Sequence, residues 1–287
     1  MGTQANHSLE AVKNFWNTHP LFAGESSEEP GTKEWFLAHE AVYNHDCFPA
    51  GKPDAIFMEG LHPGMDILDV GCGPGYWVRY FLHQGLTSVS ACDITPAAVA
   101  LTIRSLELFG LQTEGEIVEG NAESLPFTDA SFDHINCQGV IHHTPDTEQC
   151  IREFFRVLRP GGTVCFSVYY KNFLLYHPAL LRLAAGIAGK CISLKGRGRE
   201  NLLQNPDPDE VVRRYDGVDN PIGKSFTKAE ALALLSPDGF PLFKVERSAR
   251  FFFPARALPI PLPKRLHRVL HTHCGLLFVV RARKNGY

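Results

Sequence analysis

The stretch that decides the fold is LDVGCGPG, residues 68–75, in which Asp69 is followed by glycines at positions 71, 73 and 75. It continues an apolar run, MDILDV, and it opens a segment with helical character, PGYWVRYFLHQG. Glycines let a backbone turn sharply and approach a ligand closely, and a helix that begins at such a turn offers free N–H groups. This order predicts a strand, a tight glycine turn and a helix, with a ligand site at the carboxyl end of the strand.

The spacing of the glycines argues against a dinucleotide site. A dinucleotide fingerprint needs Gly-x-Gly-x-x-Gly, but the residue three positions after Gly73 is Tyr76. An acidic residue, Asp93, follows Gly71 by 22 positions, at the end of the next apolar run, SVSACDI. A carboxylate there can accept hydrogen bonds from both hydroxyls of a ribose. The alternative is that Asp93 only caps the helix predicted to begin after Thr95.

The rest of the chain continues this alternation. Helical patterns separate the apolar runs, and in the segment from Asp146 to Leu158 the apolar residues recur at helical spacing. Strands that alternate with helices predict an α/β fold, with a doubly wound, mostly parallel sheet and helices on both faces. Seven runs are predicted as strands, at residues 65–70, 88–94, 116–122, 132–140, 163–170, 243–253 and 275–283.

Taken together, these motifs resemble the class I S-adenosylmethionine-dependent methyltransferases. The resemblance is closest to the group that includes the ubiquinone/menaquinone-biosynthesis methyltransferases (methyltransferase type 11). It implies a Rossmann-like, seven-stranded sheet with an antiparallel last strand, and S-adenosylmethionine as the cofactor. It also implies methyl transfer to an O, N or C atom of a small molecule, and the motifs do not identify that acceptor. They lie within residues 65–170 and include LDVGCGPG, CDIT, GNAESLPFTDASFD, GVIHHTPD and RVLRPGG.

The resemblance further implies which residues hold the cofactor. Asp93 would bind the ribose, Ile94 would pack on the adenine, and Asn121 and Ala122 would lie beside the adenine edge. The commonest pattern of the family has Asp where this chain has Asn121, whose side-chain oxygen can still accept from the adenine amino group. The residues implied to surround the methionine part are Asp69, Gly71, Cys72, Gly73, Gly75, Gln138, Gly139 and Val140.

Three further side chains are candidates for the chemistry. A hydroxyl or amine acceptor must lose a proton, and a histidine near the methyl group can take it. His143 is the preferred candidate and His142 the alternative, because both follow the fourth strand at the predicted site edge. Tyr169 lies with Tyr170 at the end of the fifth strand, and alternation directs one of the two inward, where an aromatic face can contact a cation or a substrate ring. Each of the three can instead be structural, bonded to backbone or packed in the core.

Residues 1–60 are predicted to form a helical lid, residues 61–170 the S-adenosylmethionine-binding core, and residues 171–287 the cap insertions with the last helix and strands. In the lid, Phe15 and Trp16 either cover the cofactor or pack in the core. The cap insertions are expected at residues 171–224 and 254–274.

Charge and composition narrow the partners. Residues 244–284 contain ten lysines and arginines against one acid, Glu246, which is either an ordinary solvated surface or a positive wall for an anionic acceptor. No basic run is long enough to indicate nucleic acid, and no apolar segment is long enough to span a membrane. The alternatives are an RNA or protein methyltransferase and a cofactor-binding protein without catalysis.

Cysteine and histidine usage predicts no metal site and a reducing compartment. The eight cysteines include no Cys-x-x-Cys pair, which is typical of buried, reduced thiols in a cytoplasmic protein. His267 and His271 are spaced to share a helix face, with His273 nearby, but no cysteine or carboxylate cluster accompanies them.

Overall fold

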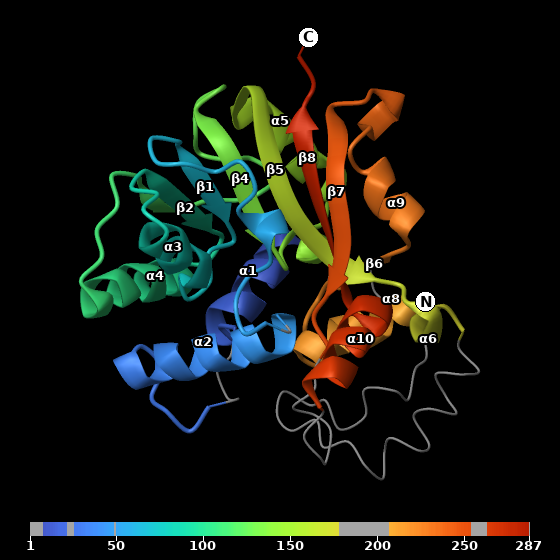
Figure 1. The fold of residues 1–287 in the computed structure, drawn as a ribbon, viewed down its shortest axis with the longest axis horizontal. Coiled ribbons are helices and arrows are strands. Elements are labelled where there is room, and N and C mark those ends of the chain that lie inside the picture. The colour runs from blue at the N-terminus through green and yellow to red at the C-terminus, as the bar shows by residue number, and fades with distance from the viewer. Residues whose placement is uncertain (1–7, 22–25, 49, 178–206, 254–262, 287) are drawn as a thin grey trace.

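The structure is a computed structural model, and it describes residues 8–21, 26–48, 50–177, 207–253 and 263–286. A sheet of eight strands runs through the middle, in the order β3-β2-β1-β4-β5-β8-β7, with β6 paired to the end of β5 (Figure 1). The strands are β1 (Ile67–Val70), β2 (Val89–Asp93), β3 (Ile117–Glu119), β4 (Phe132–Gln138), β5 (Leu158–Tyr170), β6 (Ser225–Phe226), β7 (Phe243–Phe251) and β8 (Leu277–Lys284).

The directions of the strands follow the sequence-based expectation. Strands β1 to β5 pair in parallel, whereas β8 lies between β5 and β7 and is antiparallel to both. The mostly parallel, doubly wound sheet with an antiparallel last strand is therefore confirmed.

The number of strands differs from the prediction by one, because seven were expected and β6 is an eighth. Gln138, the last residue of β4, pairs with Ser167 of β5, and β5 continues beyond that point. The two residues of β6 pair in parallel with Tyr169 and Tyr170, so they extend the sheet where β4 has ended. A two-residue strand has no periodicity that a sequence pattern could reveal.

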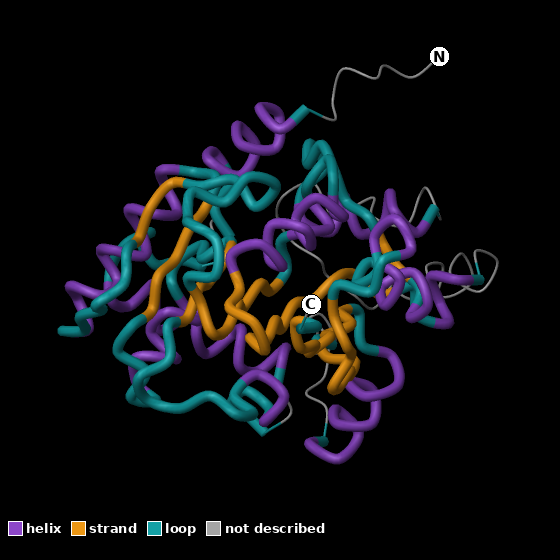
Figure 2. The backbone as a smooth tube through the Cα atoms, turned by 90° about the horizontal axis from the view of Figure 1, so that it is seen from above, coloured by secondary structure: helices purple, strands orange, loops and turns teal. Residues whose placement is uncertain are grey.

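Helices cover both faces of the sheet (Figure 2). The helix after β2 has the expected boundaries, because the Thr95 side chain accepts a hydrogen bond from the Ala98 amide, Pro96 is its first residue and Gly110 ends it. The α-helices are α1 (Leu9–Thr18), α2 (Lys33–Cys47), α3 (Tyr76–His83), α4 (Pro96–Phe109), α5 (Thr147–Val157), α6 (Phe173–Tyr176), α8 (Pro208–Asp216), α9 (Lys228–Ala233) and α10 (Lys264–Cys274). In the described residues the 3₁₀ turns are η2 (Ala55–Phe57), η3 (Ile141–His143) and η5 (Pro237–Gly239).

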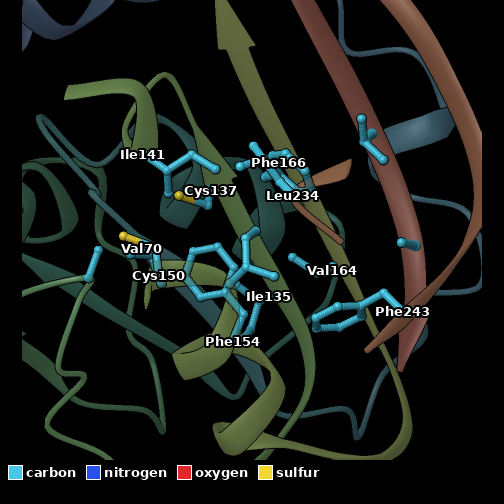
Figure 3. Packing of buried hydrophobic residues seen from close by; sticks show 14 of the residues in the cluster. Val70, Ile135, Cys137, Ile141, Cys150, Phe154, Val164, Phe166, Leu234 and Phe243 are labelled. Carbon is cyan, nitrogen blue, oxygen red and sulfur yellow. The ribbon is translucent and has the colours of Figure 1, made fainter. Parts of the chain in front are cut away.

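The core lies in two layers, one on each face. On one face, α5 and α9 pack on the sheet, with Phe154 and Leu234 pointing toward strand residues such as Phe166 (Figure 3). On the other face, α3 and η2 supply Trp77, Phe81 and Phe57. Neighbouring residues of β5 alternate between the layers, since Phe166 belongs to the first and Cys165 to the second. This double burial explains why the central strands, such as β1, are nearly continuous apolar runs.

The C-terminal insertion is more regular than its sequence suggests. Residues 254–274 were expected as a proline-rich, basic insertion, but the part from Lys264 to Cys274 forms helix α10. Residues 254–262, and residues 178–206 of the other expected insertion, lie outside the described residues. Among the helices that the structure describes, none is long and apolar enough to cross a lipid bilayer.

Candidate active site

The glycine turn after β1 has the predicted conformation. Gly71 has φ of 74°, and a Cβ atom there would lie 2.2 Å from the Val140 Cγ2 atom. Gly75 precedes α3 with φ of 77°, and its missing side chain leaves room for Thr102 and Ser105 of α4. Side chains other than glycine rarely adopt such φ values, so the sequence spacing follows directly from the backbone.

Asp93, at the end of β2, holds this turn in place. Its Oδ2 atom accepts a hydrogen bond from the Gly73 amide at 3.1 Å. Its Oδ1 atom accepts from the Thr95 amide and hydroxyl, both at 3.0 Å. The capping role considered as the alternative is therefore real. It does not use all the lone pairs of the carboxylate, because each carboxylate oxygen can accept two hydrogen bonds.

A cavity opens above the turn, at the carboxyl ends of β1, β2 and β4. Nine of the residues predicted to bind the cofactor line it, together with residues of α1 and the loop that follows it. The predicted residues in the lining are Gly71, Gly73, Asp93, Ile94, Asn121, Ala122, Gln138, Gly139 and Val140. Trp16 and His143, the candidates for the lid and for catalysis, also line it, and the other lining residues are Leu9, Val12, Pro20, Leu21, Val70, Thr95, Ala98, Gly120 and Thr144.

Three of the predicted cofactor residues are not part of that lining. Asp69 and Cys72 are buried, and Gly75 lies at the start of α3. The Thr102 hydroxyl contacts the Cys72 sulfur at 3.3 Å. These residues shape the turn from below, and direct contact of their side chains with a ligand stays a prediction.

Acceptor oxygens without partners lie buried beneath the cavity. The Asn136 amide donates to Asp69 Oδ1 at 2.7 Å, and the Gln138 amide nitrogen donates to Asn136 Oδ1 at 3.0 Å. Within the described part of the chain, Asp69 Oδ2 and Gln138 Oε1 have no hydrogen-bond donor. Burial raises the pKa of Asp69 to about 7, the nearby Asp93 adds to the rise, and the Asn136 hydrogen bond opposes it. Such oxygens are suited to a ligand that brings N–H donors.

The raised pKa of Asp69 predicts a pH dependence of stability. Between its ordinary pKa of 3.8 and about 7, the folded protein keeps a proton that the unfolded chain releases, so stability falls as the pH rises through this interval. Asp69→Asn should remove that fall. The free energy of unfolding of the variant, relative to that of the wild type, should therefore rise by up to about 4 kcal/mol between pH 4 and pH 8. Urea unfolding of the ligand-free proteins at several pH values measures the difference.

The matched control for this prediction is Asp129→Asn, because the Asp129 side chain is 79% exposed. Its pH profile should stay parallel to that of the wild type. A profile of Asp69→Asn that also stays parallel would show that Asp69 is ionised in the folded protein throughout the range.

Asn121 has a local partner as well as a place in the cavity. Its Oδ1 atom accepts a hydrogen bond from the Glu123 amide at 3.0 Å, within a short bridge between Asn121 and Ser124. A contact from the same oxygen to an adenine amino group would therefore be a second hydrogen bond, which an amide oxygen can accept.

A second cavity adjoins the first. Trp16, Leu21, Gln138, Gly139 and His143 line both. The other residues of the second cavity are mainly aromatic or titratable, and they are His39, Val42, Tyr43, Asp46, Cys47, His142, Tyr169, Tyr215, Asp216, Phe252 and Leu277.

The three candidate catalytic residues meet in this second cavity. His143 Nε2 lies 3.2 Å from Asp216 Oδ2, and its Nδ1 atom lies 2.7 Å from the Ile222 carbonyl oxygen. The Tyr169 hydroxyl donates to the same Asp216 oxygen at 2.7 Å. Both ring nitrogens of His143 thus face oxygen acceptors, and the Trp16 ring packs against the imidazole with centroids 5.1 Å apart. Asp216, which the site prediction did not include, connects His143 and Tyr169.

His142 has different surroundings. It is 1% exposed, and its ring centroid lies 4.4 Å from that of Tyr169. Burial, together with the neighbouring His143 and Lys224, lowers the pKa of His142 well below its ordinary value, and a hydrogen bond with the Ser167 backbone opposes this. The ring is therefore neutral at pH 7.

His271 of α10 and two arginines of α8 have structural partners. His267 and His271 share the buried face of α10, where His271 Nε2 contacts the Cys47 carbonyl oxygen. Arg213 and Arg214 pair with Glu210 of their own helix. In the described ranges of the chain, no group of three or more His, Cys, Asp or Glu side chains is placed to hold a metal ion.

Comparison with known proteins places this site in a family. A family described as "Methyltransferase domain" matches residues 68–166. The chain is 32% identical, over 184 residues, to the ubiquinone/menaquinone biosynthesis C-methyltransferase UbiE of Vibrio parahaemolyticus, covering 60% of this chain and 69% of that protein. It is 31% identical over 130 residues to cycloartenol-C-24-methyltransferase 1 of Oryza sativa, covering 45% of this chain and 36% of that protein.

The solved structures agree on the fold. Magnesium protoporphyrin IX methyltransferase from Synechocystis, solved with bound S-adenosylhomocysteine, superimposes with a TM-score of 0.59 at 14% identity, covering 97% of this chain and all of that one. In five of the curated relatives that it matches, the chain spans only 36% to 61% of the relative's own length.

Proposed function

The chain belongs to the S-adenosylmethionine-dependent methyltransferases, and we propose that it methylates a small-molecule acceptor held in the second cavity. The observation that carries the proposal is the junction of the two cavities. The glycine turn, Asp93 and Asn121 line the first, an aromatic and titratable set lines the second, and Gln138 and Gly139 line both. Methyl transfer needs this adjacency, since donor and acceptor must meet in line.

The described residues fit the cofactor of this family. Buried Asp69 Oδ2 and Gln138 Oε1 lack donors, and the ammonium group of S-adenosylmethionine brings three. Asp93 would hold the ribose and Asn121 the adenine edge, while Gly71 and Gly73 leave the space that the methionine part needs. When bound, S-adenosylmethionine supplies an activated methyl group.

The task of the protein is then alignment and exclusion of water. Trp16 and Leu21, on α1 and just after it, line both cavities and would cover the reacting atoms as the predicted lid. His143 and Tyr169, held through Asp216, would form the wall on the acceptor side.

The described lining also bears on the acceptor. It contains no lysine or arginine, whereas Asp46 and Asp216 belong to the second cavity. Part of the basic excess near the C-terminus is paired elsewhere, as Arg247 is with Glu59 and Arg283 with Glu246. The charges of this lining therefore do not support an anionic acceptor. The absence of a nucleic-acid partner and a cytoplasmic location stay predictions.

Calorimetry followed by an activity screen tests the proposed function. The purified protein should bind S-adenosylmethionine and S-adenosylhomocysteine, and it should release S-adenosylhomocysteine with members of a panel of small hydroxyl, amine and carbon acceptors. Cofactor binding without release of S-adenosylhomocysteine across a broad panel would favour a cofactor-binding protein without catalysis. Release only with RNA or protein as the acceptor would favour an RNA or protein methyltransferase. Absence of cofactor binding would refute the proposal.

His143→Ala should lower turnover of an acceptor found in that screen by roughly 10- to 1,000-fold, because the acceptor wall loses the group anchored by Asp216 and Ile222. Affinity for S-adenosylhomocysteine should stay within about threefold of the wild type, since no polar atom that the cofactor needs is removed. The exposed His83 provides the control, and His83→Ala should change neither quantity. Unchanged turnover of His143→Ala would make His143 a structural residue.

A further inference from the structure

The two adjacent histidines of η3 differ in how many of their ring nitrogens have a hydrogen-bond partner. His143 has an oxygen acceptor at each ring nitrogen, Asp216 Oδ2 and the Ile222 carbonyl. His142 takes part in a hydrogen bond with the Ser167 backbone, while its Nδ1 atom has no partner in the described chain. The hydrogen bond with the Ser167 backbone raises the pKa of His142, so the ring donates it, and because Nδ1 has no such partner the donor is Nε2. In the neutral ring Nδ1 then carries an unshared electron pair and can only accept.

Two donors close to His142, Tyr169 and Lys224, are already committed. The Tyr169 hydroxyl donates to Asp216. The Lys224 ammonium group donates to the Pro145 carbonyl at 2.8 Å and to the Thr147 hydroxyl at 3.1 Å. None of these contacts includes His142 Nδ1. A buried acceptor left without a donor costs about 1–3 kcal/mol, and a ligand in the adjoining cavity can remove that cost.

We propose that His142 Nδ1 accepts a hydrogen bond from the acceptor molecule, and that the second cavity therefore selects acceptors bearing an O–H or N–H group. This inference rests on the proposed function of the same site. It narrows the acceptor from O, N or C nucleophiles to molecules with such a donor, because a pure hydrocarbon face would leave Nδ1 unpaired. The neighbouring rings of Tyr43, Tyr169 and Phe252 favour a flat, partly apolar molecule.

Phenol and toluene test this inference, because they share a ring and differ in one hydroxyl. Their dissociation constants are measured by NMR titration of the protein saturated with S-adenosylhomocysteine. The quantity of interest is the dissociation constant of toluene divided by that of phenol. A change in cavity shape affects both constants alike, so it cancels in this ratio. His142→Phe should lower this ratio about fivefold, the value of one neutral hydrogen bond.

Two further variants make the test specific. His142→Asn keeps an acceptor oxygen near the Nδ1 position and should retain most of the wild-type ratio. His83→Phe, at an exposed position of α3, should leave the ratio unchanged. Circular dichroism and the affinity for S-adenosylhomocysteine establish that each variant is folded. An unchanged ratio in His142→Phe, or no binding of phenol to the wild type, would overturn the inference.

Nitrogen-15 NMR of the histidines in the wild type gives an answer that needs no variant. His142 should be the neutral Nε2–H tautomer from pH 6 to pH 8, and phenol but not toluene should shift its Nδ1 signal. A proton on Nδ1 would overturn the inference. Failure of the wild type to bind S-adenosylhomocysteine would instead refute the proposed function, so the two failures are distinguishable.

Discussion

Asp93→Ala should reduce the affinity for S-adenosylmethionine and S-adenosylhomocysteine by at least about 100-fold, below the range of routine calorimetry. The carboxylate would make charge-assisted hydrogen bonds to two ribose hydroxyls, worth about 1.5–3 kcal/mol each. It also anchors the Gly73 amide and Thr95, so its loss loosens the turn that lines the cavity. Titration calorimetry with both ligands measures the effect.

The control for Asp93 is an aspartate at the opposite end of the sheet. Asp133 accepts a hydrogen bond from the Asp66 amide at 2.9 Å and pairs with Arg159 at 2.7 Å, so it has a comparable structural role away from the cavities. Asp133→Asn should lower the thermal midpoint and leave both affinities unchanged. If Asp93→Ala binds the two ligands as the wild type does, Asp93 has no role in holding the ribose.

Gly71→Ala should destabilise the folded protein by about 2–5 kcal/mol. A Cβ atom at position 71 would overlap Val140 at 2.2 Å, and overpacking of this kind costs about 1–3 kcal/mol. The positive φ of 74° adds about 1–2 kcal/mol for a residue with a side chain. Urea unfolding measures the loss, and affinity for S-adenosylhomocysteine should fall with it because the first cavity is distorted.

Gly85→Ala isolates the conformational part of that effect. Gly85 also has a positive φ, 84°, but a Cβ atom there would meet nothing within 4 Å. The control should therefore lose only about 1 kcal/mol and keep its ligand affinity. Equal losses in the two variants would mean that Val140 moves aside readily and that the close packing at Gly71 is unimportant.

The cofactor-binding half of the site could be predicted from the sequence because its signals are local. The residues from Asp69 to Gly75 are contiguous, and their φ values and close approaches require glycine at fixed positions. Asp93 could be found because it ends the next strand, and parallel neighbours bring their carboxyl ends to one edge. The strands and their order of appearance followed from apolar runs of sufficient length.

The acceptor-binding half of the site, the second cavity, could be predicted from the sequence only in part. His142, His143 and Tyr169 could be placed at the sheet edge, but Asp216, which connects two of them, lies 47 positions after Tyr169 on a different element. Likewise, His39 and Tyr43 reach the second cavity from α2, a helix with no fixed spacing to the glycine motif. No periodicity encodes such contacts, because they depend on how separate elements pack.

The surroundings that distinguish the two histidines could be seen only in the structure. His143 is the preferred candidate on sequence alone, but two adjacent residues of the same type offer no pattern that separates their hydrogen-bond partners. The distinction arises from partners on other segments, Asp216 and Ile222 for His143 and the Ser167 backbone for His142. Sequence reasoning could propose a histidine here but could not determine its hydrogen-bonding state.

The central place of β8 has a consequence for biosynthesis of the chain. This strand lies between β5 and β7, yet it is the last of the strands to leave the ribosome. Until it emerges, β5 and β7 each keep an edge of unpaired backbone N–H and C=O groups that can associate with other chains. We therefore expect that the nascent protein completes its sheet only after β8 has been synthesised, and that shielding of these edges by chaperones improves its yield.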